Sequence, residues 1–319
     1  MQNFSHEFHT LNYTITGCDS ILLFAHTRPD GDTVGSVLAL KEYIKSLGKK
    51  VDIACYDQVH PYLDSFYREL FIHPDKLNLN DYKLIIAADS VERGFEKILP
   101  KLNSDQITVI IDHHPDIKIT ADVKIVDPSF SSVCEIIYNF FSSQDIEITQ
   151  EMSTYLMLGI LNDTGMLQHS NTTSHVLGII SALMKRGAPM GKIINTTFNN
   201  KKISTLKLWG LAFERARINP ENGMIISVLT KKDIEEFDAD NEDIAQVATI
   251  LNTVPGTKFS LILSERNNGI IKGSLRSEKY KGVNVSELAA QFGGGGHVLA
   301  SGFEIKGKLV ETKNGWEIV

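Results

Sequence analysis

Cysteine is scarce in this 319-residue chain, and its distribution excludes two kinds of site. Cys18, Cys55 and Cys134 are odd in number, lie far apart and form no C-x-x-C pair. This pattern excludes a disulfide framework and a cysteine-rich zinc site. It is typical of a protein that works in a reducing compartment, so we expect a cytoplasmic location.

Long hydrophobic runs are also absent from the sequence. No run approaches the roughly 18 apolar residues that a membrane-spanning helix needs. Residues 1–10 are polar and lack the apolar centre of a secretion signal. We therefore expect a protein that has no membrane partner.

Positive charge is in short supply as well. The chain has 32 Lys and Arg residues against 39 Asp and Glu residues, which gives a formal net charge of -7. A broadly basic surface that coats long duplex nucleic acid is therefore excluded, whereas a local basic pocket for a short phosphorylated ligand is compatible. The hydrophobic fraction of 42% is ample for sizeable cores, and the length favours two domains.

Four short apolar runs in the first half of the chain predict buried β-strands. They alternate with helical patterns such as residues 33–47, which is typical of parallel strands that are covered on both faces. The N-terminal domain is therefore predicted to be α/β with a parallel, doubly wound sheet, followed by a helical region over 131–186. The predicted strands are residues 21–25, 51–55, 84–88 and 107–111.

The second half of the chain has a different pattern. Strands are predicted at 224–229, 258–265 and 270–275, the last two joined by a hairpin at Asn268-Gly269. Helices at 243–252 and 285–292 and a strand pair over 300–318 complete a smaller, mixed α/β domain. The predicted domains are residues 1–190 and 217–319, with a linker helix region at 191–216.

Acidic and imidazole side chains follow three of the predicted parallel strands. His26, Asp30 and Asp32 follow the first strand, Asp89 follows the third, and Asp112-His113-His114 follows the fourth. Each aspartate taken alone has an ordinary explanation, because Asp is common in turns and at helix starts. The carboxyl ends of parallel strands, however, meet at one edge of the sheet, where α/β proteins bind ligands.

Several carboxylates in one crevice repel each other unless cations lie between them. Asp163, which interrupts the helical region, is a further candidate ligand. Carboxylate oxygens and imidazole nitrogens without thiolates favour Mn²⁺ or Mg²⁺. Two such ions can clamp a phosphoryl group and acidify a water molecule, with Asp89 as the natural bridge between them.

A glycine run in the second domain suggests where a phosphate binds. Gly293-Gly294-Gly295-Gly296-His297 follows a predicted helix, and glycine lets backbone N–H groups approach an anion closely. Arg276 offers a planar fork that suits phosphate. A flexible connection is the alternative explanation for the run. The predicted substrate-binding residues are Arg276, Gly294, Gly295, Gly296 and His297.

The motifs, taken together and in order, resemble those of the DHH phosphoesterase superfamily. The N-terminal motifs that carry the resemblance are His26-x-x-x-Asp30-x-Asp32, Asp89-Ser90, Asp112-His113-His114 and Asp163-Thr164-Gly165. The glycine run, Ala300-Ser301-Gly302 and Ser274-Leu275-Arg276-Ser277 resemble the DHH-associated C-terminal domain.

The resemblance implies a role for each predicted site residue. His26, Asp30, Asp89 and Asp163 would hold one ion, and Asp32, Asp89 and His113 would hold the other. His114 would contact the scissile phosphate or the nucleophilic water. Asp112 would orient the two histidines, with an ordinary turn carboxylate as an equal alternative.

Within the superfamily, the length and two-domain layout are most similar to the oligoribonuclease and 3′,5′-bisphosphate nucleotidase group. The resemblance implies hydrolysis of phosphoesters with two divalent ions, Mn²⁺ before Mg²⁺, and a homodimer. The implied substrates are short oligoribonucleotides and linear dinucleotides, with pAp as a further candidate. The alternatives are a cyclic-dinucleotide phosphodiesterase, a phosphatase for another small metabolite, and a non-catalytic nucleotide sensor, which the complete ligand set disfavours.

Overall fold

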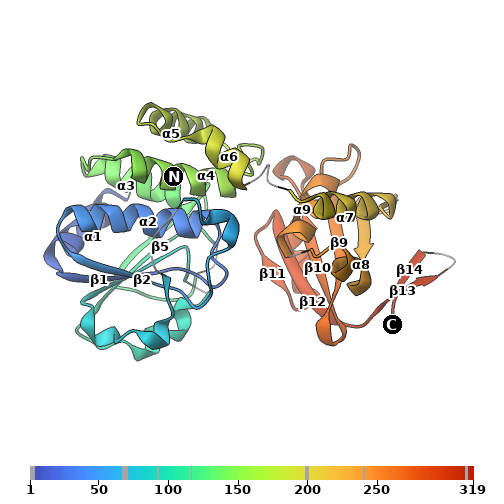
Figure 1. The fold of residues 1–319 in the computed structure, drawn as a ribbon, viewed down its shortest axis with the longest axis horizontal. Coiled ribbons are helices and arrows are strands. Elements are labelled where there is room, and N and C mark those ends of the chain that lie inside the picture. The colour runs from blue at the N-terminus through green and yellow to red at the C-terminus, as the bar shows by residue number, and fades with distance from the viewer. Residues whose placement is uncertain are drawn as a thin grey trace. The chain divides into compact units, whose positions relative to one another are not determined.

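A computed structural model describes residues 4–66, 71–91, 93–115, 117–197, 201–239, 241–312 and 315–319. The chain divides into two compact units, Met1–Asn200 and Lys201–Val319, each with its own sheet (Figure 1). Helix α6 belongs to the first unit and α7 to the second, whereas the sequence predicted a separate linker over 191–216. In the ranges described, no helix combines the length and the apolar composition needed to cross a bilayer.

A six-stranded parallel sheet forms the centre of the first unit. This confirms the predicted fold class and its four central strands. The two short edge strands β3 and β6 were not predicted. In spatial order the strands are β3 (Phe71–Ile72), β2 (Lys50–Ala54), β1 (Ser20–Phe24), β4 (Leu84–Ala88), β5 (Ile107–Asp112) and β6 (Val123–Val126).

The strand order reverses between β1 and β4, because the chain builds outwards from β1 in one direction and from β4 in the other. In open parallel sheets such a reversal leaves a crevice at the carboxyl ends of the two strands, where ligands bind. His26 follows β1 and Asp89 follows β4 directly. The topology therefore brings together two predicted ligands that are 63 positions apart in the sequence, from 26 to 89.

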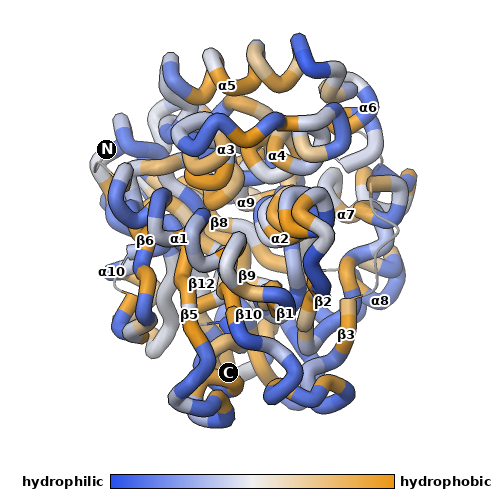
Figure 2. Tube along the Cα trace, turned by 90° about the vertical axis from the view of Figure 1, so that its left-hand side faces the viewer, coloured by the Kyte–Doolittle hydropathy of each residue, from blue (hydrophilic) through white to orange (hydrophobic). Residues whose placement is uncertain are grey.

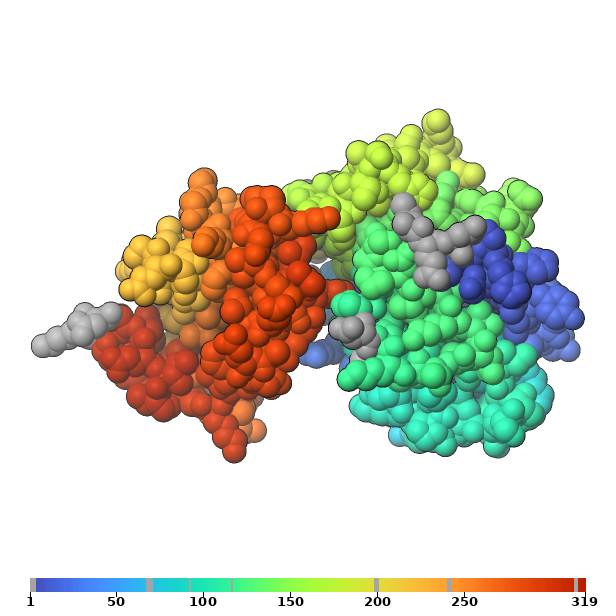
Figure 3. All heavy atoms as spheres, turned by 180° about the vertical axis from the view of Figure 1, so that it is seen from behind, coloured from blue at the N-terminus to red at the C-terminus, as the bar shows by residue number. Residues whose placement is uncertain are grey.

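Two hydrophobic clusters cover the two faces of this sheet, because alternate strand residues point to opposite sides. Leu23 packs in the larger cluster under the α-helices, and Leu22 packs in the smaller one, with Phe95 and Ile98 from 3₁₀ turns. Figure 2 shows hydrophobic colour concentrated along the strands, and Figure 3 shows the dark blue α1 beside green segments. The helices are α1 (Ser5–Gly17), α2 (Gly31–Ser46), α3 (Val133–Ser143), α4 (Gln150–Asp163), α5 (Ser174–Lys185) and α6 (Met190–Thr197).

The second unit contains a mixed six-stranded sheet and a separate strand pair. Strands β8 and β9 are parallel, and the other neighbours are antiparallel. The sheet order is β11 (Gly295–Gly296), β12 (Ala300–Lys306), β10 (Ile270–Arg276), β9 (Phe259–Arg266), β8 (Met224–Leu229) and β7 (Arg217–Asn219). The separate pair is β13 (Leu309–Thr312) and β14 (Gly315–Ile318).

The predicted hairpin between β9 and β10 is present, and Asn268 and Gly269 adopt the left-handed φ values of 62° and 66° that its turn requires. The predicted strand pair over 300–318 was wrong in its pairing, since β12 joins the main sheet and pairs with β10. The helices of this unit are α7 (Ile203–Glu214), α8 (Lys231–Glu236), α9 (Asn241–Leu251) and α10 (Val285–Ala290).

Candidate metal centre and glycine-rich loop

The loop that follows β1 positions the first two predicted ligands. Nδ1 of His26 lies 2.6 Å from the carbonyl oxygen of Thr27 and donates to it, since a carbonyl can only accept. Nε2 of His26 therefore faces the carboxylates, 3.6 Å from Oδ2 of Asp30 and 3.5 Å from Oδ2 of Asp89. Burial opposes the charged imidazole, but these two carboxylates outweigh burial and raise the pKa of His26.

Asp30 has a structural task in addition to its place in the cluster. It is the N-cap of α2, and its Oδ1 accepts hydrogen bonds from the backbone N–H groups of Asp32 and Thr33 at 3.0 and 3.1 Å. Burial disfavours its charge, yet the imidazole of His26, 3.6 Å away, lowers the pKa of Asp30 below its usual range. The capping bonds fix Oδ1, so Oδ2 remains directed at His26.

Asp89 lies at the centre of the cluster, and its backbone is strained. Its φ of 56° is in the left-handed region, which is uncommon outside glycine and is typical of functional sites. Burial and the nearby carboxylates raise the pKa of Asp89 to about 6. The hydroxyl of Thr33 donates to Oδ2 of Asp89 at 2.5 Å. Sequence reasoning missed Thr33, because a threonine at a helix start has an ordinary local explanation.

Asp32 is buried and is held by another helix. Its Oδ2 accepts from the N–H of Val133 at 2.7 Å, and its Oδ1 accepts from the N–H of Cys134 at 2.9 Å. These are orphan donors in the first turn of α3, where the positive end of the helix dipole favours an anion. Burial first, and then the charge of Asp163, raises the pKa of Asp32.

His113 and Asp163 form a close pair. Nε2 of His113 lies 3.1 Å from Oδ2 of Asp163, while its Nδ1 lies 3.3 Å from the carbonyl oxygen of Phe130. Burial opposes the charged ring, but the Asp163 carboxylate raises the pKa of His113 to about 10. We expected Asp163 to share an ion with His26 and Asp30, and in the structure its carboxylate also pairs with His113.

Asp112 orients His114. Its Oδ1 accepts from the backbone N–H of His114 at 2.9 Å and from Nδ1 of the same residue at 2.7 Å. These two hydrogen bonds fix the imidazole plane and favour the tautomer in which Nε2 is an acceptor. Burial disfavours the carboxylate, but the His114 contacts lower the pKa of Asp112.

The donor atoms of the cluster lie close enough together to surround metal ions. Within the described residues of the first unit, three groups of ligand atoms each lie within 4.8 Å of one another, and Asp89 belongs to all three. Nε2 of His26 and Oδ1 of Asp89 are buried and make no hydrogen bond, which is costly unless a cation occupies the space beside them. The donor set therefore fits divalent ions. The groups are His26, Asp30 and Asp89; Asp32, Asp89 and His113; and Asp89, Asp112 and His114.

A second residue that sequence reasoning missed is Asn171. Its amide nitrogen donates to the carbonyl oxygen of Asp163 at 3.1 Å and to that of Ser131 at 3.3 Å. Asn171 thus ties the end of α4 to the loop before α3. Ser132 is the N-cap of α3, and its hydroxyl oxygen accepts from the N–H of Glu135 at 3.0 Å.

In the second unit, strand pairing brings Arg276 beside the glycine-rich segment. Arg276 is the last residue of β10 and pairs with Ala300, three residues after His297. One of its Nη atoms donates to the carbonyl oxygen of Leu275 at 2.8 Å, and burial lowers the pKa of its guanidinium group. The predicted phosphate-binding residues are therefore neighbours within one unit.

The glycine-rich segment is more ordered than the sequence suggested. The N–H of Gly294 bonds the carbonyl oxygen of Ala289 at 3.0 Å, and that of His297 bonds the carbonyl oxygen of Ala300 at 2.9 Å. These two N–H groups are thus already used within the loop. Gly296 has a φ of 138°, and a Cβ there would lie 2.7 Å from the carbonyl oxygen of Ala300. Close packing alone therefore requires glycine at position 296. Gly295 and Gly296 are exposed, so a phosphate could approach their backbone.

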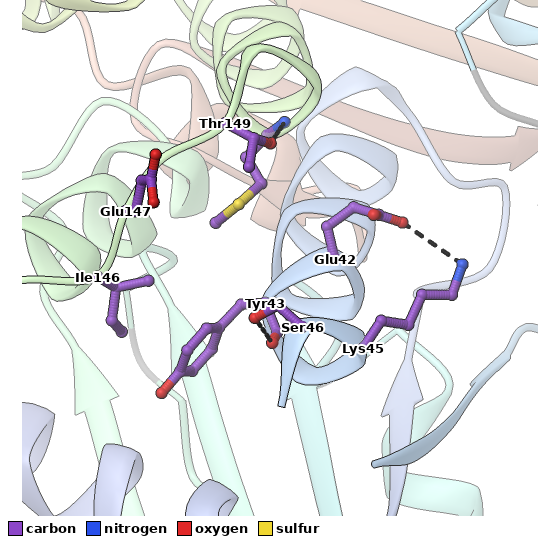
Figure 4. Close-up of a pocket in the computed structure, with 8 residues that line it drawn as sticks. Glu42, Tyr43, Lys45, Ser46, Ile146, Glu147 and Thr149 are labelled. Carbon is purple, nitrogen blue, oxygen red and sulfur yellow. Dashed lines mark hydrogen bonds and ion pairs between the residues drawn. The ribbon is translucent and has the colours of Figure 1, made fainter. Parts of the chain in front are cut away.

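A surface pocket of about 510 Å³ lies elsewhere on the first unit (Figure 4). It is at the C-terminal end of α2, where Glu42 forms an ion pair with Lys45 at 3.5 Å. Roughly 15–18 Å of helix separates this end from the Asp30 to Asp32 end. None of the predicted site residues lines the pocket, whose lining residues are Glu42, Tyr43, Lys45, Ser46, Ile146, Glu147, Thr149 and Met152.

Comparison with protein families gives two matches. Residues 20–160 match the N-terminal domain of the DHH family, and residues 221–314 match the DHHA1 domain. The first match contains every predicted ligand of the metal cluster except Asp163, and the second contains Arg276 and the glycine-rich segment.

Two relatives cover almost the whole chain. The chain is 29% identical to "Probable bifunctional oligoribonuclease and PAP phosphatase NrnA" of Streptococcus mutans, over 92% of each protein. It is also 29% identical to "Bifunctional oligoribonuclease and PAP phosphatase NrnA" of Bacillus subtilis, over 92% of this chain and 91% of that protein.

Solved structures share the fold. An exopolyphosphatase-related protein from Bacteroides fragilis has a TM-score of 0.87 at 24% identity, over 95% of this chain and 92% of that one. RecJ from Thermus thermophilus in complex with Mn²⁺ has a TM-score of 0.54 at 12% identity, over 95% of this chain and 52% of that one.

Proposed function

Because the chain belongs to the DHH family and carries a DHHA1 domain, we propose that it is a metal-dependent phosphoesterase that hydrolyses short oligoribonucleotides and linear dinucleotides. The observation that carries this proposal is the position of Asp89. Asp89 follows β4 at the reversal of strand order, and it belongs to the three groups of candidate ligands in the first unit. A carboxylate in that position can serve two ions at once.

Two divalent ions would be held by the predicted ligands. His26, Asp30 and Asp89 would hold one, and Asp32, Asp89 and His113 would hold the other, with Asp163 beside His113. Mn²⁺ is our first choice, since oxygen and imidazole ligands suit it and the structurally similar RecJ holds it. When bound, the ions would neutralise phosphoryl charge and make a water molecule more acidic.

The protein's own residues supply orientation and proton handling. Asp112 holds His114 through Nδ1, so Nε2 is the ring nitrogen of His114 that would contact a phosphoryl oxygen or take a proton from the attacking water. Thr33 fixes Oδ2 of Asp89 through its hydroxyl, which keeps that carboxylate in one orientation. Both contacts pre-set the geometry before a substrate arrives.

Substrate binding is assigned to the second unit. Arg276 would contact a phosphate with its planar fork, and the exposed backbone of Gly295 and Gly296 would contribute with His297. The relatives named oligoribonuclease and PAP phosphatase support short RNA and pAp as substrates. The three scattered cysteines favour the cytoplasm, and a homodimer remains part of the proposal.

The first experiment replaces Asp89 by asparagine. Asparagine tolerates the left-handed φ of this position better than alanine, so the fold is retained while one ligand oxygen is lost. We expect D89N to lose Mn²⁺-dependent hydrolysis and to bind less Mn²⁺. The matched control is D19N, because Asp19 is fully exposed. Full activity in D89N would contradict the two-ion proposal.

The second experiment compares substrates. Hydrolysis of pAp, pApA, cyclic-di-AMP and RNA of two to twenty nucleotides should show a preference for short linear molecules. Equal turnover of two-mers and twenty-mers would contradict that preference. R276A should mainly raise KM if Arg276 binds ground state and transition state alike. Tight binding of dinucleotides without turnover would favour the sensor alternative.

A further inference from the structure

An aromatic ring lies at the entrance to the glycine-rich segment. Phe292 directly precedes Gly293, and its side chain is 51% exposed. The ring stacks on Phe303, with centroids 4.6 Å apart and an interplanar angle of 24°. Since Phe303 covers one face of the Phe292 ring, a ligand that stacks on this ring would do so on the opposite face.

The supporting ring is held firmly. Phe303 is 6% exposed and belongs to the hydrophobic cluster that packs under α10. Across the β10–β12 pair it lies opposite Gly273, and a Cβ on Gly273 would collide with the ring. A Cβ on Gly294 would lie 2.6 Å from the Cβ of Phe303. Gly273 and Gly294 thus leave room for the ring of Phe303, on which Phe292 stacks.

The stacked pair lies close to the predicted phosphate-binding residues of the same unit. Gly273 pairs with Phe303, and three residues further along the strands Arg276 pairs with Ala300. Three residues of a β-strand span roughly 10 Å. Three is an odd number of steps, so Arg276 points to the opposite face of the sheet from Phe303. The phosphate contacts beside the stacked pair would therefore come from the exposed backbone of Gly295 and Gly296, which follow Phe292 in the same segment.

We propose that the exposed face of Phe292 is a stacking platform for a nucleobase, next to the phosphate-binding residues of the second unit. A rigidly backed aromatic face binds any base, because every base has a π-face, and purines offer the larger overlap. Isolated exposed phenylalanines are common on protein surfaces. The firm backing by Phe303 and the position beside the loop distinguish Phe292 from such residues. The inference rests on the proposed function only in taking a nucleotide as the ligand.

The test measures binding rather than hydrolysis, so its outcome does not depend on the metal-centre proposal. The full chain is titrated with AMP and with ribose 5-phosphate, which share the phosphate and sugar but differ in the base. We expect AMP to bind about tenfold more tightly, which corresponds to ~1.4 kcal/mol. F292A should lose this preference while its affinity for ribose 5-phosphate stays unchanged.

Two further variants complete the test. F292W keeps an aromatic face and should retain the preference for AMP. F213A removes a half-exposed phenylalanine from α7, whose buried residues pack in a different cluster of the same unit, and it should behave like the wild type. The proposal is overturned if wild-type protein shows no preference for AMP, or if F292A keeps it. Failure of D89N to lose activity would leave this result unaffected.

Discussion

The backbone of Gly159 lies against the carboxylate of Asp32. A Cβ on Gly159 would lie 2.6 Å from Oδ1 of Asp32 and would also collide with Cys134. Helix α4 therefore approaches α2 so closely that only glycine fits beside the candidate ligand. The metal cluster depends on this helix packing as well as on the strand ends.

Replacing Gly159 by alanine should displace Asp32. The inserted methyl group forces a backbone shift, which typically costs about 1–3 kcal/mol of unfolding free energy, and it should weaken Mn²⁺ binding. Urea denaturation and calorimetric Mn²⁺ titration measure the two effects. The matched control is G178A in α5, where an added Cβ meets no atom within 4 Å. Wild-type Mn²⁺ affinity in G159A would show that Asp32 is not a ligand.

Removing the hydroxyl of Thr33 should weaken the hold on Asp89. T33V keeps the shape of the buried side chain but loses the 2.5 Å hydrogen bond to Oδ2. Loss of such a supporting contact typically lowers metal affinity about 10- to 100-fold. T33S should restore most of it, and T154V on α4, where the hydroxyl bonds only its own helix, is the control. Equal Mn²⁺ requirements in T33V and wild type would contradict this role.

The sequence predicted the cluster because its residues stand where the sequence pattern shows a strand to end. His26 and Asp89 each follow a continuous apolar strand, and the strand order brings them together. Thr33 and Asn171 could not be found in this way. Their decisive partners lie 56 and 40 positions away, and neither residue departs from what a helix start or a loop ordinarily contains.

The missed elements of the fold have a similar explanation. Helix α1 lies in a polar segment, and its stability comes from packing, since Phe8 contacts Phe140 of α3 with ring centroids 5.8 Å apart. Such a tertiary contact leaves little periodic pattern in the sequence. The glycine-rich segment was identified, but its close packing against Phe303 could not be foreseen, because that depends on the β10–β12 register.

The metal-free first unit should lose stability as the pH rises. The folded-state pKa of His113 is raised to about 10, against about 6.5 in an unfolded chain. Its protonation stabilises the fold fully below pH 6.5, and this contribution is lost as the pH rises towards 10. Urea denaturation followed by far-UV circular dichroism at pH 6.5 and 9 checks this. H113Q should flatten the dependence, and an unchanged free energy of unfolding in the wild type would contradict it.

The second unit offers an independent signal for such measurements. Both tryptophans of the chain, Trp209 and Trp316, belong to it, so tryptophan fluorescence follows this unit alone. Arg215 lies over the ring of Trp316 at 5.0 Å from its centroid. Tryptophan emission therefore reports on the second unit, whereas far-UV circular dichroism reports on the helices and strands of both units.

Acid should destabilise the second unit through Asp233. Burial disfavours its carboxylate, but the Arg215 guanidinium and Thr230 outweigh burial and lower the pKa of Asp233. A depressed pKa stabilises the fold above about pH 4, and this contribution is lost as the pH falls through the folded-state pKa. Tryptophan fluorescence in urea at pH 6 and 3 should show the loss. D233N should weaken the dependence, whereas D238N, at an exposed position, should keep it.

Asn171 should prove to be a positioning residue for Asp163. Its amide group donates to the carbonyl oxygens of Asp163 and Ser131, and N171D replaces that donor by an acceptor of the same shape. The two carbonyls would then face a carboxylate, so the end of α4 should shift and carry Asp163 away from His113. We expect Mn²⁺ affinity to fall about tenfold, as for other supporting contacts of metal ligands.

A purely structural role for Asn171 predicts a different pattern. In that case N171D would lower the free energy of unfolding without changing Mn²⁺ affinity in the folded protein. The control is N139D. Asn139 contacts His175 of α5 and lies on α3 beyond the first turn, which holds Asp32. The Mn²⁺ dissociation constant and the KM for pApA, measured together, separate the two roles. A raised dissociation constant with an unchanged KM at saturating Mn²⁺ is the result expected of a residue that acts through Asp163.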